Sequence, residues 1–193
     1  MNLVIIICVA LGLALNLFAS LVCKGAVLAQ IDQKKICIST LIFSAWQLIT
    51  LVIGNVAAIW IEYLQDSREM NQFTWVGSIF IFAVFAVHMV RKAWKNEPVV
   101  ERREDILLRK SVMKFSFQMG LPTIFAGMAF GFLGANLLQE VIVIALCAII
   151  VFIAGLYTGY RVGYVHKTVA YIIGALFMIA SDVYLIASYF VIA

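Results

Sequence analysis

The sequence predicts an all-α integral membrane protein with six transmembrane helices arranged as two inverted three-helix repeats. Hydrophobic residues make up 65% of the 193 residues, charged residues make up 12%, and the mean hydropathy is +1.06. Soluble domains of this size are much more polar. Six long apolar stretches are separated by short polar connectors, and a membrane crossing needs about 20 residues. Weak similarity between the two halves of the chain is the third observation, and it predicts the repeats.

The six spans follow one another along the chain, with boundaries good to a few residues. They are residues 2–22, 36–62, 73–92, 112–134, 140–160 and 168–192. The first apolar run is too long for a cleavable signal peptide and has no basic residues before it, so we interpret it as a span. A signal peptide cleaved after Ala29 is the alternative interpretation.

Basic side chains are distributed unevenly among the connectors. All but one of the 14 lie on the same side of the predicted spans, and Arg68 is the exception. They are Lys24, Lys34 and Lys35; Arg91, Lys92, Lys95, Arg102, Arg103, Arg109, Lys110 and Lys114; and Arg161 and Lys167. The positive-inside rule places these connectors in the cytoplasm, which predicts a multi-pass membrane protein with both termini outside.

The longest connector, residues 93–111, separates residues 1–92, with three spans, from residues 112–193, with three more. Pro98 and the mixed charges at 101–105 favour a solvated linker, and a partner-docking segment is the alternative. An odd number of spans per half inserts homologous halves upside down relative to each other. In order along the chain, residues 12–19 can be set beside 119–126, 53–55 beside 154–156, and 76–80 beside 173–177.

Asn16 places an amide near the centre of the first span. Gly12, Asn16 and Ser20 recur every four residues and therefore share one face of a helix. Lipid offers an amide no partner, so this face is predicted to turn toward other helices or a cavity. Pro122 in the fourth span removes a backbone donor from the carbonyl of Gln118, which predicts a kinked or broken helix. Such helices bind cargo in many transporters, and a simple packing kink is the alternative.

The second span carries a mostly polar stripe of Ser44, Gln47, Leu51 and Asn55. Two amides on one face are poorly placed against lipid. The stripe therefore predicts either the lining of a cavity or interhelical hydrogen bonds, which contribute about 0.6 kcal/mol each in membranes.

Asp182 is the only carboxylate that lies well inside a predicted span. Its insertion costs about 2.5–3.5 kcal/mol, so it needs water, a cation or a donor nearby. Proton coupling or cation coordination are the functional interpretations. Hydrogen bonds to the backbone near Pro122, to Ser181 or to Tyr184 are the structural ones.

Together these observations predict two sets of residues around one pocket. The cargo-binding candidates are Asn16, Gln47, Pro122, Thr123 and Asp182. The residues expected to line the cavity are Gly12, Ser20, Ser44, Asn55 and Gln118.

Small residues at four-residue spacing predict close helix packing, within the chain or between copies. They are Gly127 and Gly131 in the fourth span, and Gly155, Gly159 and Gly163 in the fifth. The four cysteines are not spaced as a disulfide framework or a zinc site would require. The sequence has no nucleotide-binding loop, catalytic triad or histidine–carboxylate cluster, so we predict neither an enzyme nor a cofactor, and no nucleic-acid partner.

Residues 11–26, with 47–54, 120–127 and the fifth-span glycines, resemble the small bacterial manganese exporters of the MntP type, within the LysE-like group of six-span exporters. The similarity covers essentially the whole chain and implies the same two inverted repeats. The family pattern has aspartates at the positions of Asn16 and Pro122, and commonly a glutamate at that of Gln47. The resemblance therefore implies a manganese site whose acids are missing here. Amides keep oxygen ligands for a hard cation but lose the negative charge.

Two functions follow from this resemblance. In the first, the chain exports a weakly held divalent cation or a changed small cargo, which Asn16, Gln47, Thr123 and Asp182 contact. In the second, it is a non-transporting accessory or assembly subunit that retained the fold. The predicted partners are the lipid bilayer and a membrane subunit or second copy of the chain.

Overall fold

The computed structural model describes residues 3–28, 30–64, 70–95, 108–163 and 167–192, and these form six α-helices without a strand. The helices are α1 (Leu3–Gly25), α2 (Gln33–Leu64), α3 (Met70–Lys95), α4 (Arg109–Phe132), α5 (Leu137–Val162) and α6 (Lys167–Ile192). Each contains a segment long and apolar enough to cross a membrane. The prediction of six membrane-spanning helices is confirmed, with helix ends a few residues from the predicted boundaries.

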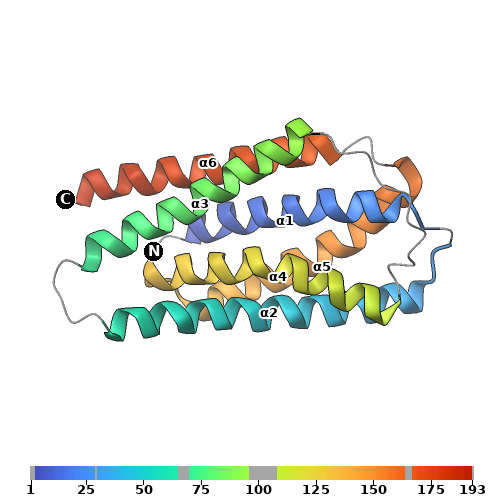
Figure 1. The fold of residues 1–193 in the computed structure, drawn as a ribbon, viewed down its shortest axis with the longest axis horizontal. Helices are drawn as coiled ribbons and strands as arrows, with labels where there is room; N and C mark the ends of the chain where they lie inside the picture. The colour runs from blue at the N-terminus through green and yellow to red at the C-terminus, as the bar shows by residue number, and fades with distance from the viewer. Residues whose placement is uncertain (1–2, 29, 65–69, 96–107, 164–166, 193) are drawn as a thin grey trace.

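Successive helices run in opposite directions through the bundle (Figure 1). Both chain termini therefore lie at one end, which we call the terminal end. The opposite end, which we call the basic end, holds the C-terminus of α1 with Lys24 and the N-terminus of α4 with Arg109. Residues 96–107 of the predicted connector, including Pro98, Arg102 and Arg103, lie outside the described residues, as does Arg68.

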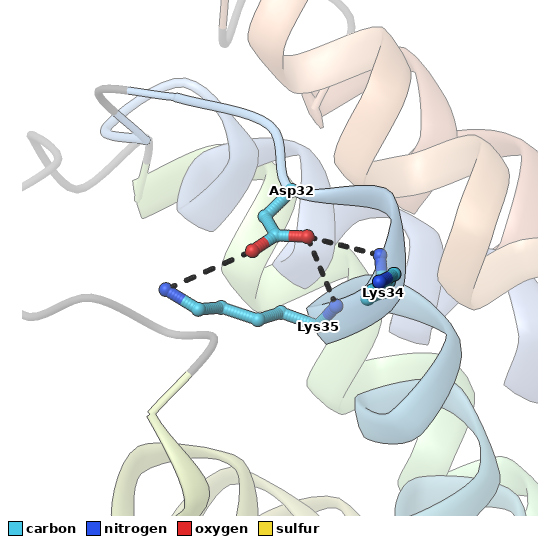
Figure 2. Close-up of polar contacts among 3 residues, drawn as sticks. All are labelled: Asp32, Lys34 and Lys35. Atoms are coloured by element: carbon cyan, nitrogen blue, oxygen red, sulfur yellow. Dashed lines mark hydrogen bonds and ion pairs between the residues drawn. The ribbon is translucent and has the colours of Figure 1, made fainter.

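Asp32 caps the N-terminus of α2 at the basic end (Figure 2). The Asp32 Oδ1 accepts hydrogen bonds from the backbone N–H groups of Lys34, at 3.0 Å, and Lys35, at 3.5 Å. Its Oδ2 lies 4.0 Å from the Lys35 Nζ. A carboxylate in this position satisfies donors that the first helical turn leaves free. Asp32 is thus an exposed carboxylate with a structural role.

The most extensive helix contacts join the first three helices to the last three. α1 packs against α5 and α6, α2 against α4 and α5, and α3 against α4 and α6, while α1 and α4 meet over a short stretch. The same set of pairs is obtained when α1 is exchanged with α4, α2 with α5 and α3 with α6. The two predicted repeats interlock, and a twofold relation between them stays a prediction.

Glycines bring two helix pairs into backbone contact. A Cβ at Gly127 in α4 would overlap the Leu51 carbonyl oxygen of α2, and one at Gly159 in α5 would overlap the Val22 carbonyl oxygen of α1. Gly131 packs against Ala58, and Gly155 against Leu21. Gly163 differs from the packing role expected of it: it caps the C-terminus of α5 at a φ of 74°, and a Cβ added there would have no neighbouring atom within 4 Å.

Candidate functional site

A cavity of about 40 Å³ lies where α1, α2, α4 and α5 meet. Four of the five cargo-binding candidates lie on its wall: Asn16, Gln47, Pro122 and Thr123. The remaining lining residues are Ala10, Leu13, Ala14, Leu17, Met119, Ile144, Cys147 and Ala148. One water needs roughly 10–15 Å³ measured in this way. The cavity therefore has room for a few water molecules, or for a small ion with a water or two.

Small side chains leave this space open between closely packed helices. Ala10 and Ala14 face it from α1, one turn apart, and Ala148 faces it from α5. Pro122 contributes a ring without an N–H group. Because α1 contacts α5 and α2 contacts α4 through glycines, the helices converge while their alanines keep the centre hollow.

Asn16 carries an unpaired polar group on the cavity wall. Its side chain is 6% exposed, and its Oδ1 is buried without a hydrogen-bond partner in the structure. A buried amide oxygen left unpaired costs about 1–3 kcal/mol. An oxygen of this kind on a cavity wall is a natural acceptor for water or ligand for a cation.

Gln47 and Thr123 form a polar contact across the cavity wall. Gln47 is 5% exposed, and its Oε1 accepts a hydrogen bond from the Thr123 Oγ1. The same hydroxyl lies 3.3 Å from the carbonyl oxygen of Met119 and can donate there instead. A hydroxyl proton with two alternative acceptors can release the Gln47 oxygen to a ligand at small cost.

The helix around Pro122 corrects one expectation and narrows another. α4 is one continuous helix from Arg109 to Phe132, so Pro122 does not break it, and a kink at Pro122 stays a prediction. Gln118 lies on its exposed side and does not line the cavity, whereas Met119 and Thr123 do. The reason is the helical phase: residues 119 and 123 share a face, and residue 118 is rotated about 100° from 119.

Gly12 and Ser20 lie beside α6 and do not line the cavity. A Cβ at Gly12 would come within 2.9 Å of Met178. The Ser20 Oγ donates to the Asn16 carbonyl oxygen at 3.1 Å and lies 3.2 Å from the Tyr171 hydroxyl. The face shared by Gly12, Asn16 and Ser20 therefore packs largely against α6, with the Asn16 side chain alone reaching the cavity wall.

The polar stripe of α2 is buried along its length, but of its members Gln47 alone lines the cavity. Ser44 is buried elsewhere, and Asn55 hydrogen-bonds to Glu140. Asp182 is 8% exposed and lies off the cavity, one turn beyond the residue that packs against Gly12. Its Oδ1 is buried without a hydrogen-bond partner.

Glu140 is a buried polar residue that was not predicted from the sequence. Its side chain is fully buried, although the predicted span began at this residue. α5 starts three residues earlier, where Asn136 caps it by accepting a hydrogen bond from the Leu138 N–H at 3.1 Å. The spacing Glu140, Ile144, Ala148 on one helix face could have indicated burial. Among the described residues no group of three or more histidine, cysteine, aspartate or glutamate side chains could hold a metal ion.

Three buried aromatic side chains pack against lining residues of the cavity, on the side of the basic end. The Phe43 ring lies 5.8 Å from that of Phe115 and 5.1 Å from that of Phe152, and all three are buried. The Lys24 Nζ lies 5.4 Å from the centroid of Phe115. These residues come from the same four helices that surround the cavity.

The sequence pattern of one protein family, described as "Putative manganese efflux pump", matches residues 30–186. Relatives named "Putative manganese efflux pump MntP" occur in several organisms. That of Mannheimia succiniciproducens is 26% identical over 175 residues, covering 90% of each chain. That of Methanothermobacter thermautotrophicus is 24% identical over 179 residues, covering 93% of this chain and 92% of the relative. No solved structure matches the chain.

Proposed function

This chain belongs to the Mntp family of membrane metal exporters, and from that premise we propose that it exports a divalent cation, with Mn²⁺ as the first candidate, through a site that holds the ion weakly. The central observation is the cavity of about 40 Å³ whose wall carries the unpartnered Oδ1 of Asn16. Its size supports a small ion as cargo.

The ligands on the wall support weak binding. Mn²⁺ is a hard cation that prefers carboxylate, carbonyl and water oxygens. Asn16 and Gln47 offer two amide oxygens, the Thr123 hydroxyl donates to the Gln47 oxygen, and no carboxylate of the described residues lines the cavity. Neutral oxygens replace part of the hydration shell but do not offset the ion's charge in a buried site. A weakly held ion is also released readily on the far side.

The charge distribution supports a direction for transport. In the proposed orientation the basic end faces the cytoplasm and both termini lie outside. The aromatic cluster of Phe43, Phe115 and Phe152 would then lie on the cytoplasmic side of the cavity. Export would require the four helices around the cavity to shift and expose it to each side in turn.

Flux measurements on the purified chain in liposomes test the proposal. Vesicles containing a Mn²⁺-sensitive dye should report uptake by wild-type protein, and Asn16→Leu should reduce the rate at least 10-fold because it removes the free amide oxygen. Asp32→Asn is the control, since it changes an exposed cap far from the cavity. Wild-type protein without flux of Mn²⁺ or another divalent cation, or Asn16→Leu with a normal rate, would contradict the proposal. A stoichiometric membrane partner in that case would favour the accessory-subunit alternative.

A further inference from the structure

A second polar site lies between α2 and α5, toward the terminal end of the bundle. The Asn55 Nδ2 donates a hydrogen bond to the Glu140 Oε2 at 3.2 Å. Glu140 is fully buried, Asn55 is 5% exposed, and the Glu140 Oε1 has no hydrogen-bond partner among the residues that the structure describes. Neither Asn55 nor Glu140 takes part in the ion pair between Asp32 and Lys35. Glu140 is thus a buried carboxylate with one satisfied oxygen and one unsatisfied oxygen.

The helix termini around this pair favour a bound cation. Glu140 lies in the first turn of α5, where the positive end of the helix dipole stabilises an ionised carboxylate. The last turn of α4 packs against Asn55, because a Cβ at Gly131 would lie 3.1 Å from the Asn55 carbonyl oxygen. The C-terminal end of a helix carries negative partial charge and attracts cations. The pair therefore combines a carboxylate, an amide oxygen and a negative helix end.

The pair is aligned with the central cavity along α5. Glu140 precedes Ile144 by four residues and Ala148 by eight, so the three share a helix face, and both Ile144 and Ala148 line the cavity. One helical turn, about 5.4 Å, separates Glu140 from Ile144 along the axis. An ion that left the cavity toward the terminal end along this face would meet the Glu140 carboxylate first.

We propose that Glu140 and Asn55 form a second cation-binding site, which takes a divalent cation from the central cavity on its way to the terminal end of the bundle. The inference rests on the proposed export function for its direction but not for the existence of the site. In this arrangement the cavity supplies neutral ligands and the second site supplies the charge. The side-chain ligands of this site are the unpaired Oε1 of Glu140 and the amide oxygen of Asn55.

A purely structural explanation is that the pair only fastens the start of α5 to α2. The variant Glu140→Gln separates the two explanations, because its amide oxygen can still accept the Asn55 hydrogen bond while the charge is lost. Asp32→Asn is the matched control: it also removes one carboxylate, but an exposed one at the basic end.

The experiment counts Mn²⁺ ions bound to the purified full-length chain by the electron paramagnetic resonance signal of free Mn²⁺. We expect two ions per chain for the wild type and for Asp32→Asn, and one for Glu140→Gln. In liposomes Glu140→Gln should slow Mn²⁺ flux at least 10-fold. Equal ion counts for the wild type and Glu140→Gln would overturn the second site.

A gain-of-function variant guards against misfolding of Glu140→Gln. Asn55→Asp places a second carboxylate beside the first, so a cation site should bind Mn²⁺ about 10-fold more tightly. No gain in Mn²⁺ affinity for Asn55→Asp would also overturn the proposal. If wild-type liposomes show no flux, the export function fails while the ion count still decides the second site.

Discussion

The central cavity and the Asn55–Glu140 pair differ in what each provides to an ion. The cavity has space, about 40 Å³, and neutral oxygens from Asn16, Gln47 and Thr123. The pair has a fully buried carboxylate with an unsatisfied oxygen, held by one hydrogen bond of 3.2 Å. Space and charge thus occur at different levels of the same bundle. The difference suggests that entry of an ion into the cavity and its stabilisation by charge are separate steps.

Moving the charge into the cavity should have the largest effect. The double variant Asn16→Asp/Gln47→Glu places two carboxylates on the cavity wall, and about 1.4 kcal/mol per carboxylate corresponds to roughly 100-fold tighter Mn²⁺ binding. Isothermal titration calorimetry with the purified protein measures this change. Flux should fall as affinity rises, because a tightly held ion leaves slowly. Unchanged affinity would show that the cavity does not hold the ion.

Removing the amide from the pair should have the next largest effect. Asn55→Ala leaves the buried Glu140 carboxylate without its donor, which should cost about 1–3 kcal/mol of stability. The loss should appear as a lower unfolding temperature of the detergent-solubilised protein. Added Mn²⁺ should raise the unfolding temperature of Asn55→Ala part of the way back to the wild-type value, because a ligand that binds the folded state stabilises it. An equal Mn²⁺-induced rise of the unfolding temperature in Asn55→Ala and in the wild type would place the ion in the cavity alone.

A variant that removes the hydrogen bond between Thr123 and Gln47 should lower the stability of the protein with little effect on its Mn²⁺ affinity. Thr123→Val keeps the shape of the side chain but removes the hydroxyl, so stability should fall by about 1 kcal/mol. The freed Gln47 oxygen should remain available to Mn²⁺, so its affinity should change less than threefold. Thermal unfolding and calorimetry on the same preparation measure the two quantities. An affinity loss beyond 10-fold would make the Thr123 hydroxyl itself a ligand.

The sequence predicted the six helices because long apolar runs leave few alternatives in a membrane. It also predicted Asn16, Gln47, Pro122 and Thr123 as neighbours, and the structure brings them to one cavity. The lining residues around them were harder to predict. A helix presents a new direction every 100°, so the expected lining residue Gln118 faces outward although the adjacent Met119 faces inward.

Glu140 escaped prediction for a related reason. A carboxylate at the boundary of an apolar run is usually assigned to the headgroup region, and span boundaries from sequence are good only to a few residues. α5 begins three residues before it, and the last turn of α4 packs against its partner Asn55. Burial at a helix start depends on such neighbours, which periodicity within one helix does not contain. Asp182, by contrast, was predicted to lie well inside a span, because the apolar run extends far on both sides of it.

The variant Ser20→Ala should have the smallest effect and serves as a reference for the other variants. Its hydroxyl donates to the Asn16 carbonyl oxygen and lies 3.2 Å from the Tyr171 hydroxyl, between α1 and α6. Ser20→Ala should therefore cost about 0.6 kcal/mol of stability, the usual value for such a contact in a membrane. Mn²⁺ affinity should stay within twofold of the wild type, because Ser20 lines neither the cavity nor the Glu140 pair. A larger loss of affinity would mean that the backbone of Asn16, and not only its side chain, must be held in place for binding, and the boundary of the cavity site would then extend to α6.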